Sequence, residues 1–277
     1  PRLILTGDSI TQGPILANSN YLNPAPPVAL SIARMNPWLF VDNIAWGGIM
    51  SMSLMKPSDF NIPLPRPGQV RADFVCILVG ANDAIAIAGR EAYVDGAFVG
   101  KSKLPEDWRS RCRPSPALFE ASLRALARAY IASGAKVALA TPLPLGEVTI
   151  ASEQDAAEHL QPPFLVGQQL AAAVHRVAAA EGCAVIPLFE GVVHRHRQLK
   201  RPPLRWTTRA FVERLTSHRR ERLQRGLNAT PPTPWAELGA SEARAELLHD
   251  LVHPNERGAA LYATLVQAWL ERARGAS

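Results

Sequence analysis

Five short and almost continuously apolar runs are spaced along the chain, with longer helix-like stretches between them. They cover residues 2–6, 39–44, 74–79, 136–141 and 183–189. Unbroken hydrophobic runs of this length are typical of strands covered on both faces, as in a parallel sheet, whereas a half-exposed strand alternates apolar and polar residues. We expect these five segments to form one mainly parallel sheet.

The stretches with helical character cover residues 26–34, 116–133, 164–181 and 255–274. Gly134 and Gly182 follow the second and third stretches, in the position expected of a helix C-cap. The last stretch places Leu261, Leu265 and Trp269 on one stripe. Because strand and helix alternate, the pattern predicts a three-layer α/β/α sandwich.

Three segments interrupt this alternation, and each follows the carboxyl end of a predicted strand. Residues 53–72 are rich in proline, residues 88–114 mix glycine, proline and charge, and residues 190–249 are basic and rich in proline. Open α/β sheets build their binding sites at this edge. We expect a single domain over residues 1–277, with a long basic insertion at about 190–249.

The net charge of +6 comes from one part of the chain. Between residues 194 and 225, here called the basic segment, eleven Lys or Arg residues and two Glu residues give a local charge of +9, so the remainder carries −3. A nucleic-acid-binding protein usually has a broader basic surface, so we expect no nucleic-acid partner. With 47% apolar and 19% charged residues, the composition is that of a globular protein with a sizeable core.

No apolar run approaches the roughly 18 residues of a membrane-spanning helix, so no transmembrane segment is expected. The protein is expected to be soluble, in the cytoplasm or exported with its signal removed. Three widely spaced cysteines, Cys76, Cys112 and Cys183, do not fit a disulfide framework or a zinc knuckle. The oligomeric state is left open.

The first strand runs directly into Gly7-Asp8-Ser9-Ile10-Thr11-Gln12-Gly13. A serine at the end of a strand, with glycines that allow a sharp turn, presents its hydroxyl at the sheet edge while its backbone N–H stays free. Ser9 is therefore a candidate nucleophile. The alternative is that Ser9 only caps a following helix.

Two more loops should reach the same edge if the sheet is parallel. The second strand leads into Trp46-Gly47-Gly48 and the third into Gly80-Ala81-Asn82-Asp83. A tetrahedral oxyanion needs two or three preorganised donors. The backbone N–H groups of Ser9 and Gly48 and the side-chain amide of Asn82 could supply them, although either loop alone could be a plain turn.

Near the end of the chain, Asp250-Leu251-Val252-His253-Pro254 precedes the last helix. A spacing of three within a helical turn puts both ionisable side chains on one side, so that the carboxylate of Asp250 can orient the imidazole of His253. A surface salt bridge is the alternative interpretation of this pair.

Taken together, the four segments resemble the SGNH (GDSL-type) hydrolase family. The Gly-Asp-Ser-Ile-Thr block, a glycine five residues after Asn43, the Gly-x-Asn-Asp block and the terminal Asp-x-x-His-Pro occur in the family's order. The resemblance implies a flavodoxin-like fold, a catalytic triad of Ser9, His253 and Asp250, and an oxyanion hole of Ser9, Gly48 and Asn82. The segments after Asn82 and before Asp250 are longer than the family usually shows, so the substrate class does not carry over.

Other motifs do not support a cofactor. Residues 96–102 have one residue too few between their glycines for a phosphate-binding loop, and no strand precedes them. His194 and His196 have metal-like spacing, but arginines surround them and no carboxylate or cysteine cluster accompanies them. We expect no metal and no cofactor.

The sequence thus predicts a serine hydrolase of carboxylic esters that forms an acyl-enzyme on Ser9. Ile49, Met50, Ala84 and Ile85 follow the two oxyanion loops and are apolar but not bulky, which favours short acyl groups, including acetyl groups on carbohydrate. A thioesterase or lysophospholipase is the alternative activity. A non-catalytic module that binds a polyanion or a membrane surface through its basic insertion is the alternative of another class.

The basic insertion is also a candidate lid. It should leave the end of the last strand and return at Asp250, so its base should lie near His253. A concentrated positive field beside a cleft raises the local concentration of anionic ligands. Our hypothesis is that it forms a lid favouring esters that carry a carboxylate, a phosphate or an acidic sugar. The alternative is a solvated helical hairpin whose arginines face water.

Overall fold

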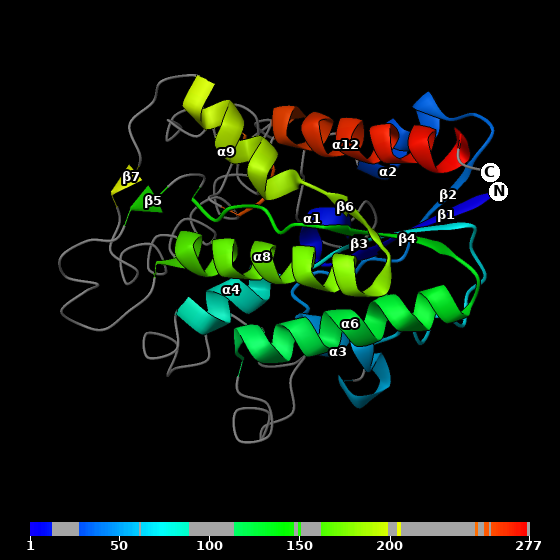
Figure 1. Ribbon diagram of the computed structural model, residues 1–277, viewed down its shortest axis with the longest axis horizontal. Coiled ribbons are helices and arrows are strands. Elements are labelled where there is room, and N and C mark those ends of the chain that lie inside the picture. The colour runs from blue at the N-terminus through cyan, green and yellow to red at the C-terminus, as the bar shows by residue number, and fades with distance from the viewer. Residues whose placement is uncertain are drawn as a thin grey trace, which may run out of the picture.

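The computed structural model describes residues 1–12, 28–60, 62–88, 114–146, 149–150, 162–198, 204–205, 247–248, 252–254 and 256–275. Five strands form one sheet in the order β2-β1-β3-β4-β6, and every pairing in it is parallel. The strands are β1 (Arg2–Gly7), β2 (Phe40–Asn43), β3 (Phe74–Leu78), β4 (Lys136–Ala140) and β6 (Ala184–Ile186). The predicted mainly parallel five-stranded sheet is confirmed (Figure 1).

The central strands are buried on both faces, as their unbroken apolar sequences predict. All five residues of β3 are buried, and so are all residues of β1 after Arg2. The edge strand β2 is only partly covered, and its first residue, Phe40, is 65% exposed. Burial on both faces is possible only where helices cover both sides of the sheet.

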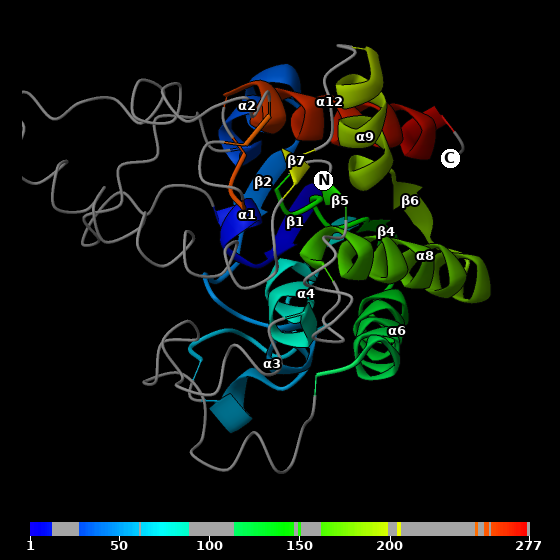
Figure 2. The ribbon, with the colours of Figure 1, turned by 90° about the vertical axis from the view of Figure 1, so that its left-hand side faces the viewer.

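Helices form a layer on each side of this sheet (Figure 2). One layer holds α2 (Val28–Met35), α9 (Leu188–Gln198) and α12 (Glu256–Gly275), and α12 packs against both of the others. The opposite layer holds α3 (Ser51–Met55), α4 (Ala81–Ala88), α6 (Pro116–Ala132) and α8 (Pro163–Glu181). The three-layer α/β/α sandwich is confirmed.

The long helices begin and end close to the predicted residues. α6 begins at Pro116, and the hydroxyl of Ser115 accepts the N–H of Leu118 at 3.1 Å, which is a side-chain N-cap. Gly134, at φ +91°, follows the C-cap residue Ser133. α8 ends on Gly182 in the left-handed conformation, with φ +69°. Both predicted glycine stops are therefore at the helix ends.

The stripe predicted on the last helix is divided between two neighbours. Trp269 is buried and makes an edge-to-face contact with Phe74, with ring centroids 6.0 Å apart. Leu261 and Leu265 are only partly buried and lie against Gly191 of α9. The face of α12 that enters the core is completed by Tyr262, Val266 and Leu270.

Several boundaries differ from the predictions. The strand predicted at 183–189 covers only Ala184–Ile186, because Leu188, Phe189 and Val192 bury one face of helix α9 instead. The predicted insertion at 190–249 therefore begins inside a helix. The segment predicted to be irregular at 53–72 contains most of α3 and the 3₁₀ turn η1 (Pro57–Phe60).

Short elements also occur where none was expected. They are α1 (Ser9–Gln12), α4, and a two-stranded parallel sheet of β5 (Thr149–Ile150) and β7 (Leu204–Arg205). Residues 26–27, most of 88–114 and most of 190–249 lie outside the described residues, so the single domain with a basic insertion stays a prediction. None of the described helices is both long enough and apolar enough to cross a membrane.

Candidate active site

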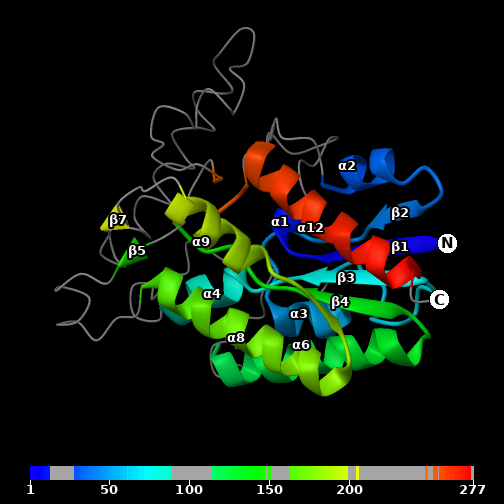
Figure 3. The ribbon, with the colours of Figure 1, turned by 45° about the horizontal axis from the view of Figure 1, so that its top comes forward.

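The candidate site lies at the carboxyl ends of β1, β2 and β3. Chain connections leave β1 toward β2 on one side, and β3 pairs with β1 on its other side, so the strand order reverses at β1. Ligands of open α/β sheets bind at such a reversal. The amino terminus of β1 lies at one end of the sheet and α1 at the other (Figure 3), so the Ser9, Gly48 and Asn82 segments follow strands that end on the same side.

Gly7 makes the turn before Ser9 possible. A Cβ at this position would lie 1.8 Å from the carbonyl oxygen of Leu78, well inside any real contact. The next N–H, that of Asp8, donates to the same oxygen at 3.2 Å. β1 and β3 can therefore approach closely only with glycine at this position, and Ser9 emerges directly from the sheet edge.

Asp8, and not Ser9, caps the short helix that follows. The N–H groups of Thr11 and Gln12 donate to the carbonyl of Asp8 at 3.1 and 3.0 Å, and its carboxylate accepts the N–H of Ile10 at 3.0 Å. The alternative interpretation of Ser9 as an N-cap is therefore wrong. Its hydroxyl is left for another partner.

That partner is His253. Ser9 Oγ and His253 Nε2 lie 2.8 Å apart, although 244 residues separate them in the chain. His253 lies three residues before the start of α12, and its neighbour Pro254 forms an antiparallel bridge with Leu248. Val252 and Leu248 are both buried in the core. A nucleophile and a base at hydrogen-bond distance are the first requirement of a serine hydrolase.

Asp250, the predicted third member of the triad, lies outside the described residues. Its role in orienting His253 stays a prediction.

Hydrogen bonds of Asn43 hold the loop after β2 against the Ser9 helix. The amide of Asn43 donates to the carbonyls of Thr11 at 2.8 Å and Gln12 at 3.3 Å, and its oxygen accepts the N–H of Ala45 at 3.1 Å. The N–H of Trp46 donates to the carbonyl of Gly7 at 2.9 Å. The loop is thereby fixed next to Ser9.

Gly48 lies exposed at the end of this loop with φ +77°. No atom lies within 4 Å of the place where its Cβ would be, so the left-handed backbone, and not crowding, favours glycine. A Cβ on the preceding Gly47 would lie 3.6 Å from the Cβ of Ser9, which shows how closely the loop passes this serine.

Asn82 is the second residue of α4 and is half-buried. Its Nδ2 donates one hydrogen bond to the carbonyl of Ile49 at 2.9 Å. Because a side-chain amide carries two N–H groups, this bond uses one and orients the other. The loop after β2 and the start of α4 are thus joined directly at the site.

The predicted acyl-contacting residues are deeply buried. Ile49, Met50, Ala84 and Ile85 are only 1–2% exposed and pack among other apolar side chains. Their contact with an acyl group stays a prediction. Trp46, which was not among the predicted residues, is half-buried in the loop that its backbone N–H ties to Gly7.

Two buried carboxyl groups beside the site were also missed by the sequence analysis. Burial raises the pKa of Asp8 to about 7, against the hydrogen bond from Ile10 and the attraction of His253. Burial raises the pKa of Asp83 to about 6, and hydrogen bonds from Ser51 oppose this rise. Aspartates are rarely buried without a specific partner, and the sequence alone does not show that these two are enclosed.

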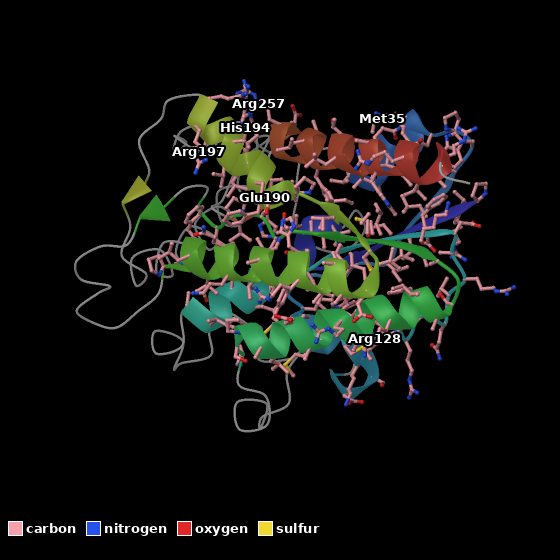
Figure 4. The ribbon with its side chains drawn as sticks, in the orientation of Figure 1. Met35, Arg128, Glu190, His194, Arg197 and Arg257 are labelled. Atoms are coloured by element: carbon pink, nitrogen blue, oxygen red, sulfur yellow. The ribbon has the colours of Figure 1, made fainter. Side chains whose placement is uncertain are left out.

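In the part of the chain that the structure describes, no group of three or more His, Cys, Asp or Glu side chains could hold a metal ion. Figure 4 shows His194 and Arg197 along α9, with Arg257 of α12 at the same end of the molecule. His194 is exposed, and its Nε2 lies 2.8 Å from the side-chain nitrogen of Gln198.

Solved structures with the same fold cover almost all of the chain. The acetylxylan esterase Axe2 from Geobacillus stearothermophilus is 15% identical with a TM-score of 0.55, over 96% of this chain and 92% of that chain. The acetyl xylan esterase AlAXEase is 15% identical with a TM-score of 0.57, over 97% and 98%. LAE5, an alpha/beta hydrolase enzyme from the metagenome of Lake Arreo in Spain, is 15% identical with a TM-score of 0.54, over 96% and 93%.

At these identities the similar structures support the fold alone. No curated protein sequence matches the chain. The family is shown by sequence instead, since the model of the GDSL-like lipase/acylhydrolase family matches residues 5–261, a range that contains all four predicted motif segments. The chain therefore belongs to the GDSL-like lipase/acylhydrolase family and is a carboxylic ester hydrolase.

Proposed function

We propose that Ser9 is the nucleophile of this esterase and that His253 is its general base. The distance of 2.8 Å between Ser9 Oγ and His253 Nε2 is the observation that carries the proposal. Ser9 Oγ attacks the carbonyl carbon of the ester while His253 takes its proton. The carbonyl oxygen becomes an oxyanion, and the intermediate collapses as His253 returns the proton to the leaving alcohol.

The second half of the reaction uses the same two residues. His253 accepts a proton from water as the water oxygen attacks the acyl-enzyme. Collapse of the second tetrahedral intermediate releases the carboxylic acid and returns the proton to Ser9 Oγ. Asp250, three residues before His253, would orient the imidazole and stabilise its charged form.

The oxyanion would be held by the backbone N–H groups of Ser9 and Gly48 and by the second amide N–H of Asn82. Gly48 is exposed at the site, and Asn82 is oriented by its bond to the Ile49 carbonyl. Donors that are fixed before the reaction stabilise the developing charge without further reorganisation.

For the substrate we propose short-chain or O-acetyl esters, including acetylated carbohydrate. Ile49, Met50, Ala84 and Ile85, which follow the two oxyanion loops in the sequence and are apolar but not bulky, favour a short acyl group. Two structural neighbours are acetylxylan esterases, which makes acetylated xylan oligosaccharides a natural first substrate to test. Nitrophenyl esters of increasing acyl length, an acyl thioester and a lysophospholipid complete the panel and test the alternative activities.

A fluorophosphonate probe provides the test of the nucleophile. The probe should label the wild-type protein and not Ser9→Ala, and that variant should lose turnover, because only an activated serine reacts with such reagents. Labelling that survives in Ser9→Ala would contradict the assignment. A wild-type protein with neither labelling nor turnover would instead support the non-catalytic binding module.

A further inference from the structure

A second set of hydrogen bonds joins the two oxyanion loops, and the mechanism above does not use it. Asp83, the third residue of α4, is buried, and its carboxylate faces Ser51, the first residue of α3. The backbone N–H of Ser51 lies 3.0 Å from Oδ2 and 3.3 Å from Oδ1, and the Ser51 hydroxyl donates to Oδ1 at 2.7 Å.

These bonds lie next to the proposed oxyanion donors in the chain. Ser51 comes three residues after Gly48, and Asp83 directly follows Asn82. Asn82 in turn donates to the carbonyl of Ile49 at 2.9 Å. Adjacent residues of α4 therefore hold the 48–51 segment at two points, through one carbonyl oxygen and through one N–H and hydroxyl.

A buried carboxylate between two helices costs free energy, because the charge is removed from water. Ser51 is 0% exposed and Asp83 5% exposed, and a buried charge is costly unless hydrogen bonds compensate for it. With its pKa at about 6, Asp83 is ionised at pH 8. Bonds to an ionised acceptor are shorter and stronger than those between neutral groups. Such bonds fix geometry more firmly than the apolar contacts around them.

We propose that Asp83 is a positioning residue, whose carboxylate holds Ser51 so that the Gly48 N–H and the Asn82 amide keep the spacing that an oxyanion requires. This inference rests on the proposed function, because it concerns the same oxyanion hole. The ground-state ester needs this spacing less than the tetrahedral intermediate does, so the loss of the carboxylate–serine contact lowers kcat more than it changes KM.

The test compares Ser51→Ala and Asp83→Asn with a matched control, Ser53→Ala. Ser53 lies on the same helix and is 1% exposed, but its hydroxyl has no hydrogen-bond partner among the described residues. Steady-state kinetics with a short nitrophenyl ester at pH 8 should show kcat reduced by about tenfold or more in the first two variants, with KM changed less than about threefold. Ser53→Ala should keep both constants.

Two further measurements separate positioning from general loss of structure. A boronic acid that forms a tetrahedral adduct with Ser9 should bind Ser51→Ala and Asp83→Asn more weakly than the wild type, by the same factor as the loss in kcat/KM of each variant. The double variant Ser51→Ala with Asp83→Asn should be no less active than the less active of the two single variants, because both substitutions break the same contact. Thermal melting of all variants identifies any that fail to fold.

The outcomes are distinguishable. Wild-type turnover together with Ser9 labelling supports the proposed function; if Ser51→Ala and Asp83→Asn then behave like Ser53→Ala, the positioning role is overturned and the proposed function stands. The positioning role is also overturned if KM rises by the same factor as kcat falls, or if the losses of the two single variants add up in the double variant. A wild-type protein without turnover or labelling overturns both proposals.

Discussion

Asp8 should make the protein less stable as the pH rises, and Asp8→Asn should remove this effect. The carboxyl is completely buried, and burial raises its pKa from 3.8 to about 7. Between these two pH values the folded protein keeps a proton that the unfolded chain has lost. Because the folded state then binds more protons, the contribution of Asp8 to stability is full below pH 3.8 and is lost as the pH rises through 7.

The size of the effect follows from the two pKa values. Each tenfold difference in proton affinity is worth about 1.4 kcal/mol, so the difference between 3.8 and about 7 corresponds to about 4 kcal/mol. Asparagine keeps an oxygen that can accept the Ile10 N–H, and it carries no charge at any pH. The variant should therefore match the wild type near pH 4 and exceed its free energy of unfolding by up to about 4 kcal/mol at pH 8.

Urea unfolding of both proteins at pH 4, 5, 6, 7 and 8 measures this difference. Taking the difference between the two proteins at each pH cancels the contributions of groups that titrate in the same way in both. The contribution of Asp83 does not cancel completely, because the repulsion between the two carboxyl groups, which raises the pKa of Asp8, is lost in the variant. A stability difference that stays constant from pH 4 to pH 8 would refute the reasoning, since it would mean that Asp8 binds no more protons in the folded protein than in the unfolded chain and that its pKa is not raised by burial.

The same variant should be a poorer enzyme. Ionised Asp8 and His253 attract each other, so a negative charge on Asp8 would stabilise the imidazolium that forms as Ser9 attacks. We expect kcat at pH 8 to fall in Asp8→Asn while stability rises. An increase in kcat would show that the charge of Asp8 opposes the reaction.

Four further predictions concern the turn, the oxyanion, the triad and the basic segment. Gly7→Ala should lower the free energy of unfolding by about 3 kcal/mol or more, because its Cβ would collide with the Leu78 carbonyl, whereas Gly134→Ala meets no atom and should cost about 1 kcal/mol in urea unfolding. Asn82→Ala should lower kcat by roughly 10²-fold with a smaller change in KM; a change in KM alone would make it a binding residue. Asp250→Asn should leave the circular dichroism spectrum intact and lower kcat by up to about 10⁴-fold, and near-normal turnover would point to another carboxylate. If the basic segment attracts anionic esters, their kcat/KM should fall with added salt while that of a neutral ester of equal size stays constant; equal responses would contradict the lid.

The sequence by itself determined the elements whose signals are local. The five apolar runs predict strands because covered parallel strands need hydrophobic residues on both faces, and the structure places a strand in each of them. Gly134 and Gly182 mark helix ends because a left-handed residue there favours glycine. The sequence also predicts that the segments of Ser9, Gly48 and Asn82 lie at one edge of the sheet, because the carboxyl ends of parallel strands lie on the same side.

The tertiary structure decided every feature that depends on segments distant in the chain. The run at 183–189 divides into a strand and helix α9 because Leu188 and Phe189 find a covering face in the folded protein. Asp8 caps the helix that begins at Ser9, while the Ser9 hydroxyl lies at hydrogen-bond distance from a histidine 244 residues away. Periodicity carries no information about either contact.

The burial of polar groups at the site is the feature that depends most clearly on the tertiary structure. Nothing in the local sequence shows that Asp8 is enclosed or that Asp83 meets Ser51, 32 residues earlier in the chain. Likewise, Ile49, Met50, Ala84 and Ile85 are apolar in the sequence, but only packing shows that the core covers them. A pKa and an exposed fraction depend on which atoms exclude water from a group, and that is set by the assembled chain and not by neighbours in sequence.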